Sequence, residues 1–84
     1  MFYVYVLKSK KKTDQLYVGY SANLKSRVAE HNTGKSSSTK PYLPWELIFY
    51  EAYKSMKDAK RREMYLKTTK GRKAIKLMLQ DSLL

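Results

Sequence analysis

The chain is poor in the residues that build cross-links and metal clusters. Its 84 residues include no cysteine, one histidine and only 7 acidic residues. Disulfide bonds and thiolate metal sites are therefore excluded, and one histidine with so few carboxylates cannot build a zinc site. The N-terminal apolar run, residues 2–7, is far too short to span a bilayer and follows no basic leader. We expect a single cytoplasmic domain over residues 1–84, with no membrane segment and no small-molecule organic cofactor.

Positive charge is what the chain has in excess. Lysine and arginine number 18 against 7 for aspartate and glutamate, which gives a net charge of +11. A field of this sign attracts polyanions, so nucleic acid is the expected partner, with DNA ahead of RNA. Two other interpretations stay open, lysines that only keep the protein soluble and contact with an anionic membrane surface. The side chains expected on the nucleic acid are Lys10, Lys11, Lys12, Lys35, Lys40, Arg61, Lys67 and Lys70.

Three strands are expected. Residues 2–7 and 16–20 are rich in tyrosine and valine, which is typical of β-strands. The polar residues 8–15 between them predict a hairpin loop, and so an antiparallel pair. A third strand over residues 45–50 should follow Pro44. Because the first strand is apolar or aromatic on both faces, the sheet should be covered on both sides by helices.

Capping signals place two longer helices. Asn23 is a suitable N-cap for the first helix, which Gly34 would end in the left-handed conformation. Ser55 and Asp58 fit a capping box, from which the second helix should run to about Thr68.

A glycine then interrupts the helical pattern at Gly71, and residues 74–79 predict a short amphipathic C-terminal helix. The predicted fold class is α/β in the broad sense and α+β more narrowly. It is a small three-stranded antiparallel sheet flanked by three helices.

Four polar side chains could meet in one cleft. Arg27 and His31 stand four residues apart, so they share one face of the first helix. Tyr5 and Tyr17 lie on paired strands, and a symmetric hairpin would place them almost opposite one another. Gly19 weakens its strand unless backbone or ligand must approach closely there. The alternatives are an exposed arginine, a surface histidine and two tyrosines that only pack.

One acidic residue is expected to point inward. Glu63 shares a helical stripe with Ala59 and Leu66, and a carboxylate in that position needs a partner. A single carboxylate leaves most coordination positions to water and substrate oxygens, which suits one Mg²⁺ or Mn²⁺ ion. The alternative is an ion pair with Lys67 at the favoured spacing of four residues.

In this order and spacing, these segments together resemble the GIY-YIG nuclease superfamily, and most closely its small stand-alone bacterial type. The resemblance extends over essentially the whole chain and implies the three-stranded sheet, the surrounding helices and one divalent-metal site. It rests on Tyr3-Val4-Tyr5, Tyr17-Val18-Gly19, the stretch from Ser21 through Asn23, Leu24, Arg27, His31 and Asn32 to Gly34, and Glu63.

The resemblance also implies an activity, which is metal-dependent hydrolysis of phosphodiester bonds as in DNA repair or recombination. It assigns catalytic roles to Tyr5, Tyr17, Arg27, His31 and Glu63, with Glu63 as the ligand of Mg²⁺ or Mn²⁺. Tyr5 would deprotonate the attacking water, which requires nearby positive charge to lower the pKa of its phenol.

One position departs from the family pattern, because many members have an asparagine where this chain has Ile75. A nucleic-acid-binding module without catalysis therefore stays open as a second hypothesis. A third is a protein-binding adaptor that uses Trp45 or the apolar residues near the C-terminus.

Overall fold

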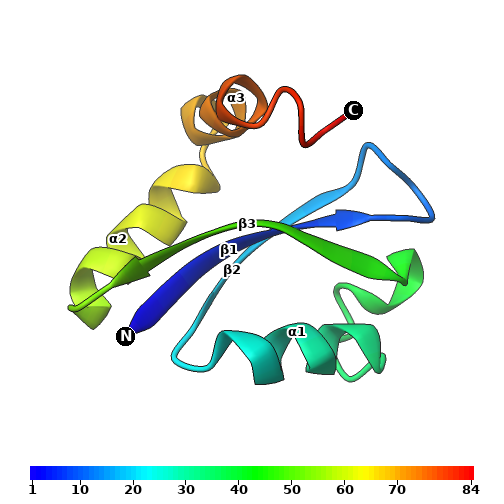
Figure 1. Ribbon diagram of the computed structural model, residues 1–84, viewed down its shortest axis with the longest axis horizontal. Coiled ribbons are helices and arrows are strands. Elements are labelled where there is room, and N and C mark those ends of the chain that lie inside the picture. Colours follow the sequence, from blue (N-terminus) through cyan, green and yellow to red (C-terminus); the bar gives the residue numbers. More distant parts are fainter.

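The computed structural model describes residues 1–84, which form three strands and three α-helices. Figure 1 shows their arrangement. In chain order the elements are β1 (Phe2–Ser9), β2 (Leu16–Ser21), α1 (Leu24–Asn32), the 3₁₀ turn η1 (Lys40–Tyr42), β3 (Trp45–Tyr53), α2 (Met56–Leu66) and α3 (Thr69–Met78).

The strands form one antiparallel sheet in the order β2-β1-β3, so β1 is central and β2 is an open edge. Tyr5 lies opposite Gly19 on β2 and opposite Tyr50 on β3, whereas Tyr17 lies opposite Leu7. The two tyrosines, predicted to lie almost opposite one another, are therefore offset by two residues along the strands. They are diagonal neighbours on the same face of the sheet, still within reach of two aromatic rings.

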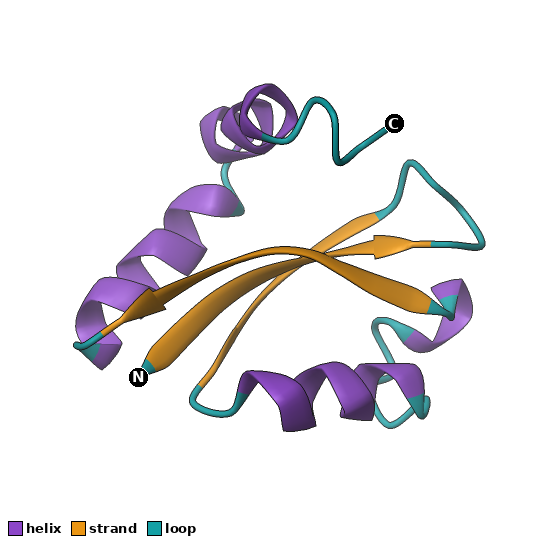
Figure 2. Ribbon diagram, viewed as in Figure 1, coloured by secondary structure: helices purple, strands orange, loops and turns teal.

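The sheet lies between two helical layers, as predicted (Figure 2). Helix α1 covers one face, and α2 and α3 cover the other. Alternate residues of β1 serve the two cores, because successive side chains of a strand point to opposite faces. The α1 side buries Tyr5, Leu7 and Trp45, and the opposite side buries Val4, Val6, Val18, Ala59, Leu66, Ile75 and Leu79.

The predicted signals at the ends of α1 are confirmed. The Asn23 side-chain oxygen accepts a hydrogen bond from the Ser26 backbone N–H at 3.1 Å. After the C-cap residue Thr33, Gly34 has a φ of +78°, the left-handed conformation that favours glycine. The third strand is longer than predicted and continues to Tyr53.

Both ends of α2 differ from the prediction. Ser55 is the N-cap of α2, but its side chain makes no capping hydrogen bond, and Asp58 instead pairs with Arg61 at 3.0 Å. The break between the helices comes at Thr68, whose hydroxyl accepts a hydrogen bond from the Gly71 backbone N–H at 3.1 Å. Gly71 therefore lies inside the first turn of α3.

The reason for a glycine at position 71 is close packing. A Cβ atom there would overlap the backbone of Tyr65 and Leu66 at the end of α2. The absent side chain thus lets the first turn of α3 rest directly on the last turn of α2. None of the helices is both long and apolar enough to cross a membrane.

Candidate functional site

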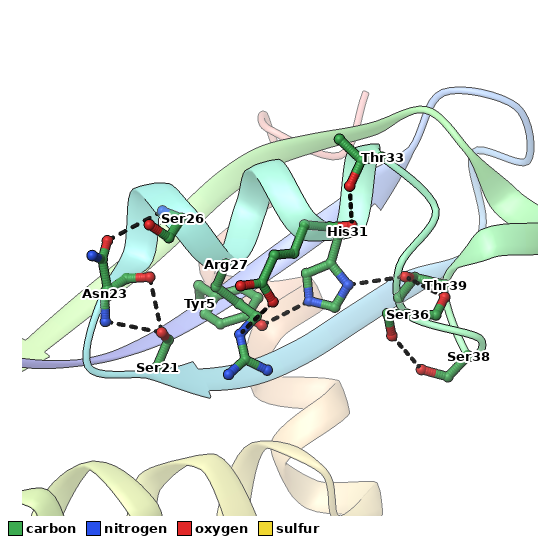
Figure 3. A network of polar contacts seen from close by, with 11 residues as sticks. Tyr5, Ser21, Asn23, Ser26, Arg27, His31, Thr33, Ser36, Ser38 and Thr39 are labelled. Atoms are coloured by element: carbon green, nitrogen blue, oxygen red, sulfur yellow. Dashed lines mark hydrogen bonds and ion pairs between the residues drawn. The ribbon is translucent and has the colours of Figure 1, made fainter.

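A buried phenol lies at the centre of the candidate site. Tyr5 comes from the middle of β1 and is only 1% exposed. Its ring crosses Gly19 on β2, where a Cβ atom would overlap the Tyr5 ring carbon Cζ and its hydroxyl. The hydroxyl therefore reaches Nε2 of His31 on α1, at 2.9 Å (Figure 3). A glycine in this strand predicted that another group approaches the backbone closely there, and the Tyr5 ring is that group.

The hydrogen-bonded chain continues beyond the histidine. Nδ1 of His31 lies 2.9 Å from the Thr39 hydroxyl, which in turn lies 3.4 Å from the backbone carbonyl of Ser36. These contacts are all satisfied when Nδ1 carries the proton and Nε2 accepts the Tyr5 hydroxyl. The indole N–H of Trp45 donates to the Thr39 carbonyl at 2.8 Å and so holds this loop in place.

Two of these residues were not foreseen from the sequence. Thr39 appeared only as one hydroxyl in a serine-rich loop, and Trp45 as a strand residue or a partner anchor. Thr39 is completely buried, and Trp45 is 5% exposed. No local pattern identifies them, because Thr39 meets His31, and Trp45 meets Thr39, only in the folded chain.

Aromatic packing brings Tyr17 into the same cluster. Its ring centroid lies 4.8 Å from that of His31 and 6.3 Å from that of Tyr5. The structure thus brings together three of the five residues expected at the site, from β1, β2 and α1.

The environment of the cluster sets the protonation of its two central groups. The pKa of Tyr5 is raised well above its ordinary value, chiefly by burial and next by Tyr17, although Arg27 opposes this rise. The expected lowering of the Tyr5 pKa is therefore wrong. The pKa of His31 is lowered below its ordinary value, first by burial and then by the Arg27 charge. Both groups are consequently neutral near pH 7.

Arg27 is the exposed cation of the site. About half of its side chain is exposed, and its Nε atom lies 3.7 Å from the Glu30 carboxylate. This weak pair leaves most of the guanidinium free for another anion. Its charge acts on both Tyr5 and His31, which places it beside the hydrogen-bonded pair at the β2 edge (Figure 3).

Glu63 approaches the site from the other face of the sheet. Its carboxylate lies 3.1 Å from Nζ of Lys67, so the ion pair considered from the sequence is present. Lys60, one turn earlier, extends over the ring of Tyr20 on β2, so this side of α2 faces the β2 edge. The negative charge of Glu63 also raises the pKa of Tyr5. The acid and the guanidinium therefore both act at the edge strand, from opposite layers.

No group of three or more His, Cys, Asp or Glu side chains is close enough to hold a metal ion. Any metal at this edge would have Glu63 as its protein ligand and would take its other ligands from water and substrate. One carboxylate is a suitable ligand for a hard divalent cation of this kind.

The basic residues expected on nucleic acid are all exposed, but two of them are already paired. Arg61 and Lys67 form ion pairs with Asp58 and Glu63, whereas the other six have no acidic partner. The prediction missed the larger concentration of charge in α2 and α3. Residues 54–76 contain ten of the 18 lysines and arginines and only two acidic residues, and the additional cations include Lys57, Lys60, Arg72, Lys73 and Lys76.

The residue that departs from the family pattern lies away from this site. Ile75 is completely buried in the core between α3 and the sheet, where it packs with Val4, Val6 and Leu66. An apolar side chain is what this position requires, because a buried amide without partners would be costly. Ile75 therefore removes no polar group from the β2 edge.

Sequence comparison agrees with this arrangement. Residues 1–76 match the family model described as the GIY-YIG catalytic domain. The chain belongs to the GIY-YIG family. This is a nuclease-type family, and its α+β domain has the sheet and helices described above. The resemblance recognised from the scattered motifs is confirmed.

The chain is also similar to small bacterial proteins of the UPF0213 group. It is 38% identical to one from Staphylococcus haemolyticus over 77 residues, which cover 90% of this chain and 92% of the relative. A protein from Pediococcus acidilactici is 34% identical and covers 99% of this chain and 86% of its own length. One from Streptococcus pyogenes serotype M5 is 42% identical over 71 residues, 83% of this chain and 75% of the relative. No solved structure gives a significant match.

Proposed function

We propose that this GIY-YIG protein is an endonuclease that hydrolyses phosphodiester bonds in nucleic acid, with DNA as the substrate and a divalent cation at Glu63. The observation that carries the proposal is the hydrogen-bonded chain from Tyr5 through His31 to Thr39. At its Tyr5 end this chain crosses Gly19 on the edge strand β2, which Arg27 and Glu63 flank from opposite layers.

The chain of hydrogen bonds supplies a route for the proton of the attacking water. Oη of Tyr5 takes a proton from the water as the Tyr5 proton passes to Nε2 of His31. The water oxygen forms a bond to phosphorus, the bond from phosphorus to the 3′ oxygen breaks, and that oxygen takes a proton from solvent. Thr39 holds the resulting imidazolium by accepting from Nδ1. This relay needs no phenolate, which agrees with the raised pKa of Tyr5.

Arg27 offsets the charge that develops on the phosphate, as a guanidinium can by donating two parallel hydrogen bonds. Tyr5 is only 1% exposed, so we propose that a path for the water to its hydroxyl opens when the half-exposed Arg27 side chain binds the phosphate. Tyr17, packed on His31, orients the water.

The donor chemistry at Glu63 fits one Mg²⁺ or Mn²⁺ ion. Its side chain is 20% exposed, and its two oxygens are shared only with Lys67. A bound ion would polarise the scissile phosphate and stabilise the leaving oxygen. When no cation is bound, Lys67 neutralises the carboxylate, so the pair and the metal site are alternative states of one group.

A macromolecular substrate suits the shape and charge of the molecule. The three hollows on the surface are lined by other residues, and Arg27, half exposed beside the open edge of the sheet, is in a position that a polymer can reach. The net charge of +11 favours a polyanion. We place the activity in the cytoplasm, where chromosomal DNA is accessible, and propose that residues 1–84 act as one domain.

The decisive experiment compares two glutamates. Purified wild-type protein is incubated with plasmid, branched and single-stranded DNA and with RNA, in Mg²⁺ or Mn²⁺. We expect cleavage that EDTA stops and that Glu63→Gln lowers at least about 100-fold, since a Lewis acid contributes several kcal/mol to such a step. Glu46→Gln is the matched control, because Glu46 is exposed on β3 and forms no ion pair. Cleavage that survives EDTA, or an active Glu63→Gln protein, would refute the proposal.

A second candidate is a nucleic-acid-binding module without catalysis. The observation in its favour is the Glu63–Lys67 ion pair, which leaves the carboxylate neutralised. This candidate predicts no turnover with any metal, but binding that weakens steeply with salt. The logarithm of the binding constant should fall by about 0.9 per phosphate contact for each unit of log salt concentration. Binding that does not respond to salt would remove this candidate.

A further inference from the structure

A concave surface lies toward the opposite edge of the sheet from the candidate site. It is a hollow of about 530 Å³ between the N-terminal half of α1 and strand β3. Tyr3 and Tyr50 form one wall, with their ring centroids 6.1 Å apart and their planes at 63°. Tyr50 is 54% exposed, so much of its ring is open to solvent. We call this surface the Tyr3–Tyr50 groove.

The rim of the groove is polar and carries no negative charge. None of its lining residues is acidic. Lys25 takes part in none of the four ion pairs of the molecule, so its ammonium group is free. Asn23 uses its side-chain oxygen to cap α1, which leaves its amide NH₂ group available to donate. The groove therefore offers two aromatic faces next to an amide donor and a cation.

The groove and the candidate active site lie on the same face of the sheet. Tyr50 lies directly opposite Tyr5 in the pairing of β1 with β3, and Tyr3 precedes Tyr5 by two residues on the same face. Tyr5 crosses toward the β2 edge while Tyr50 lies beside it on β3. One extended strand of nucleic acid can therefore contact both places by passing the N-terminal end of α1.

We propose that the Tyr3–Tyr50 groove binds an unpaired nucleobase of the nucleic acid substrate, stacked on Tyr50, with the adjoining phosphate on Lys25. This inference rests on the proposed function, which identifies the partner as nucleic acid, and it restricts the substrate to nucleic acid with an unpaired base. A base inside a duplex has both faces covered by its neighbours, so only an unpaired base can present a face to tyrosine. The favoured substrates are then nucleic acids with a single-stranded segment beside the cleaved bond.

The test measures binding, with EDTA present so that no cleavage occurs. Fluorescence anisotropy gives the affinity of the full-length protein for an oligothymidylate strand and for a blunt duplex of the same length. We expect Tyr50→Ala to weaken single-strand binding by about 5- to 150-fold and to change duplex binding less than about 2-fold. Tyr50→Phe keeps the ring and should bind like wild type.

The matched control is Tyr65→Ala, which removes another exposed tyrosine ring from the opposite side of the molecule, on α2. It should leave single-strand binding unchanged. Because Tyr50→Ala alters a strand, a second measurement uses only wild-type protein. A 2-aminopurine base within the oligothymidylate should lose fluorescence on binding as it stacks on the tyrosine.

The proposal for the groove would be overturned if Tyr50→Ala bound single strands as tightly as wild type, or if it lost equal affinity for single strand and duplex. It would also be overturned if the fluorescence of 2-aminopurine did not fall on binding. None of these results would touch the cleavage test at Glu63. Wild-type protein that binds no oligonucleotide would overturn both the groove and the partner in the proposed function.

Discussion

Adding one methyl group at Gly19 should disable the candidate site and lower the stability of the fold. In Gly19→Ala the new Cβ overlaps the end of the Tyr5 ring and lies 2.9 Å from a ring carbon of Tyr17. Tyr5 is buried, with 1% of its surface exposed, and its hydroxyl is hydrogen-bonded to His31. The clash therefore has to displace the Tyr5 hydroxyl from Nε2 of His31.

Two energy terms set the expected loss of stability. Overpacking of a buried position costs about 1–3 kcal/mol. A buried polar group left without its partner costs about 1–3 kcal/mol more. The sum, about 2–6 kcal/mol, is a large part of the roughly 4–13 kcal/mol expected for a domain of this size. The melting temperature should fall by at least about 8 °C. Catalysis should fall at least about 100-fold, because the proton relay is broken.

Circular dichroism melting and initial rates of DNA cleavage measure the two effects. Gly34→Ala is the comparison, because a Cβ there meets nothing closer than 3.8 Å and only its φ of +78° is unfavourable. That variant should lose about 1–2 kcal/mol of stability and keep its activity. Tyr5→Phe combined with Gly19→Ala should cost less than the two single changes added, since both break the same hydrogen bond.

A Gly19→Ala protein that melts and cleaves like wild type would refute this reasoning. It would mean that the Tyr5 ring has room to move and that its bond to His31 does not matter. Loss of stability with full activity would separate the two roles and remove the relay alone.

The lowered pKa of His31 gives two further predictions, and the packing of Gly71 gives a third. Because the pKa of His31 is lowered by burial and by Arg27, kcat/KM for cleavage should decline on acidification only below about pH 6.5. A decline that begins above that pH would contradict the role of His31 as the proton acceptor. The unfolded chain binds this proton first as the pH falls, so the free energy of unfolding in urea should decrease below about pH 6.5, and His31→Gln should reduce that dependence. Gly71→Ala should lower the free energy of unfolding by about 3 kcal/mol in the same urea assay, because its Cβ would overlap the Tyr65 backbone, which can move only if the whole helix moves. A variant as stable as wild type would mean that α2 and α3 are not in close contact.

The elements of the fold were largely predictable because their signals are local. Runs rich in tyrosine and valine, without alternating charged residues, indicate the strands. Asn23 and Gly34 indicate the ends of α1. The errors lie where tertiary contacts decide the outcome. Gly71 reads as a helix break, but it is a contact point between two helices. Tyr5 and Tyr17 were expected almost opposite each other but are diagonal neighbours, because loop length alone does not determine which residues face each other.

The residues of the candidate site were predictable in type but only partly in arrangement. The ordered motifs identified Tyr5 and His31, yet nothing local pointed to Thr39 or Trp45, which complete their hydrogen bonding. The groove at Tyr50 was also missed, since an exposed tyrosine in a strand has the same local sequence as a packed one.

The amino-acid sequence by itself determined the strand and helix content, the family, the strong positive charge and the chemical groups available for a reaction. Those properties depend on residue type and on neighbours along the chain. Only the tertiary structure decided that Ile75 belongs to the core, that Glu63 and Arg27 approach one sheet edge from opposite layers, and that the pKa of Tyr5 rises. Burial and charge act through space, so their balance exists only once distant segments have packed together.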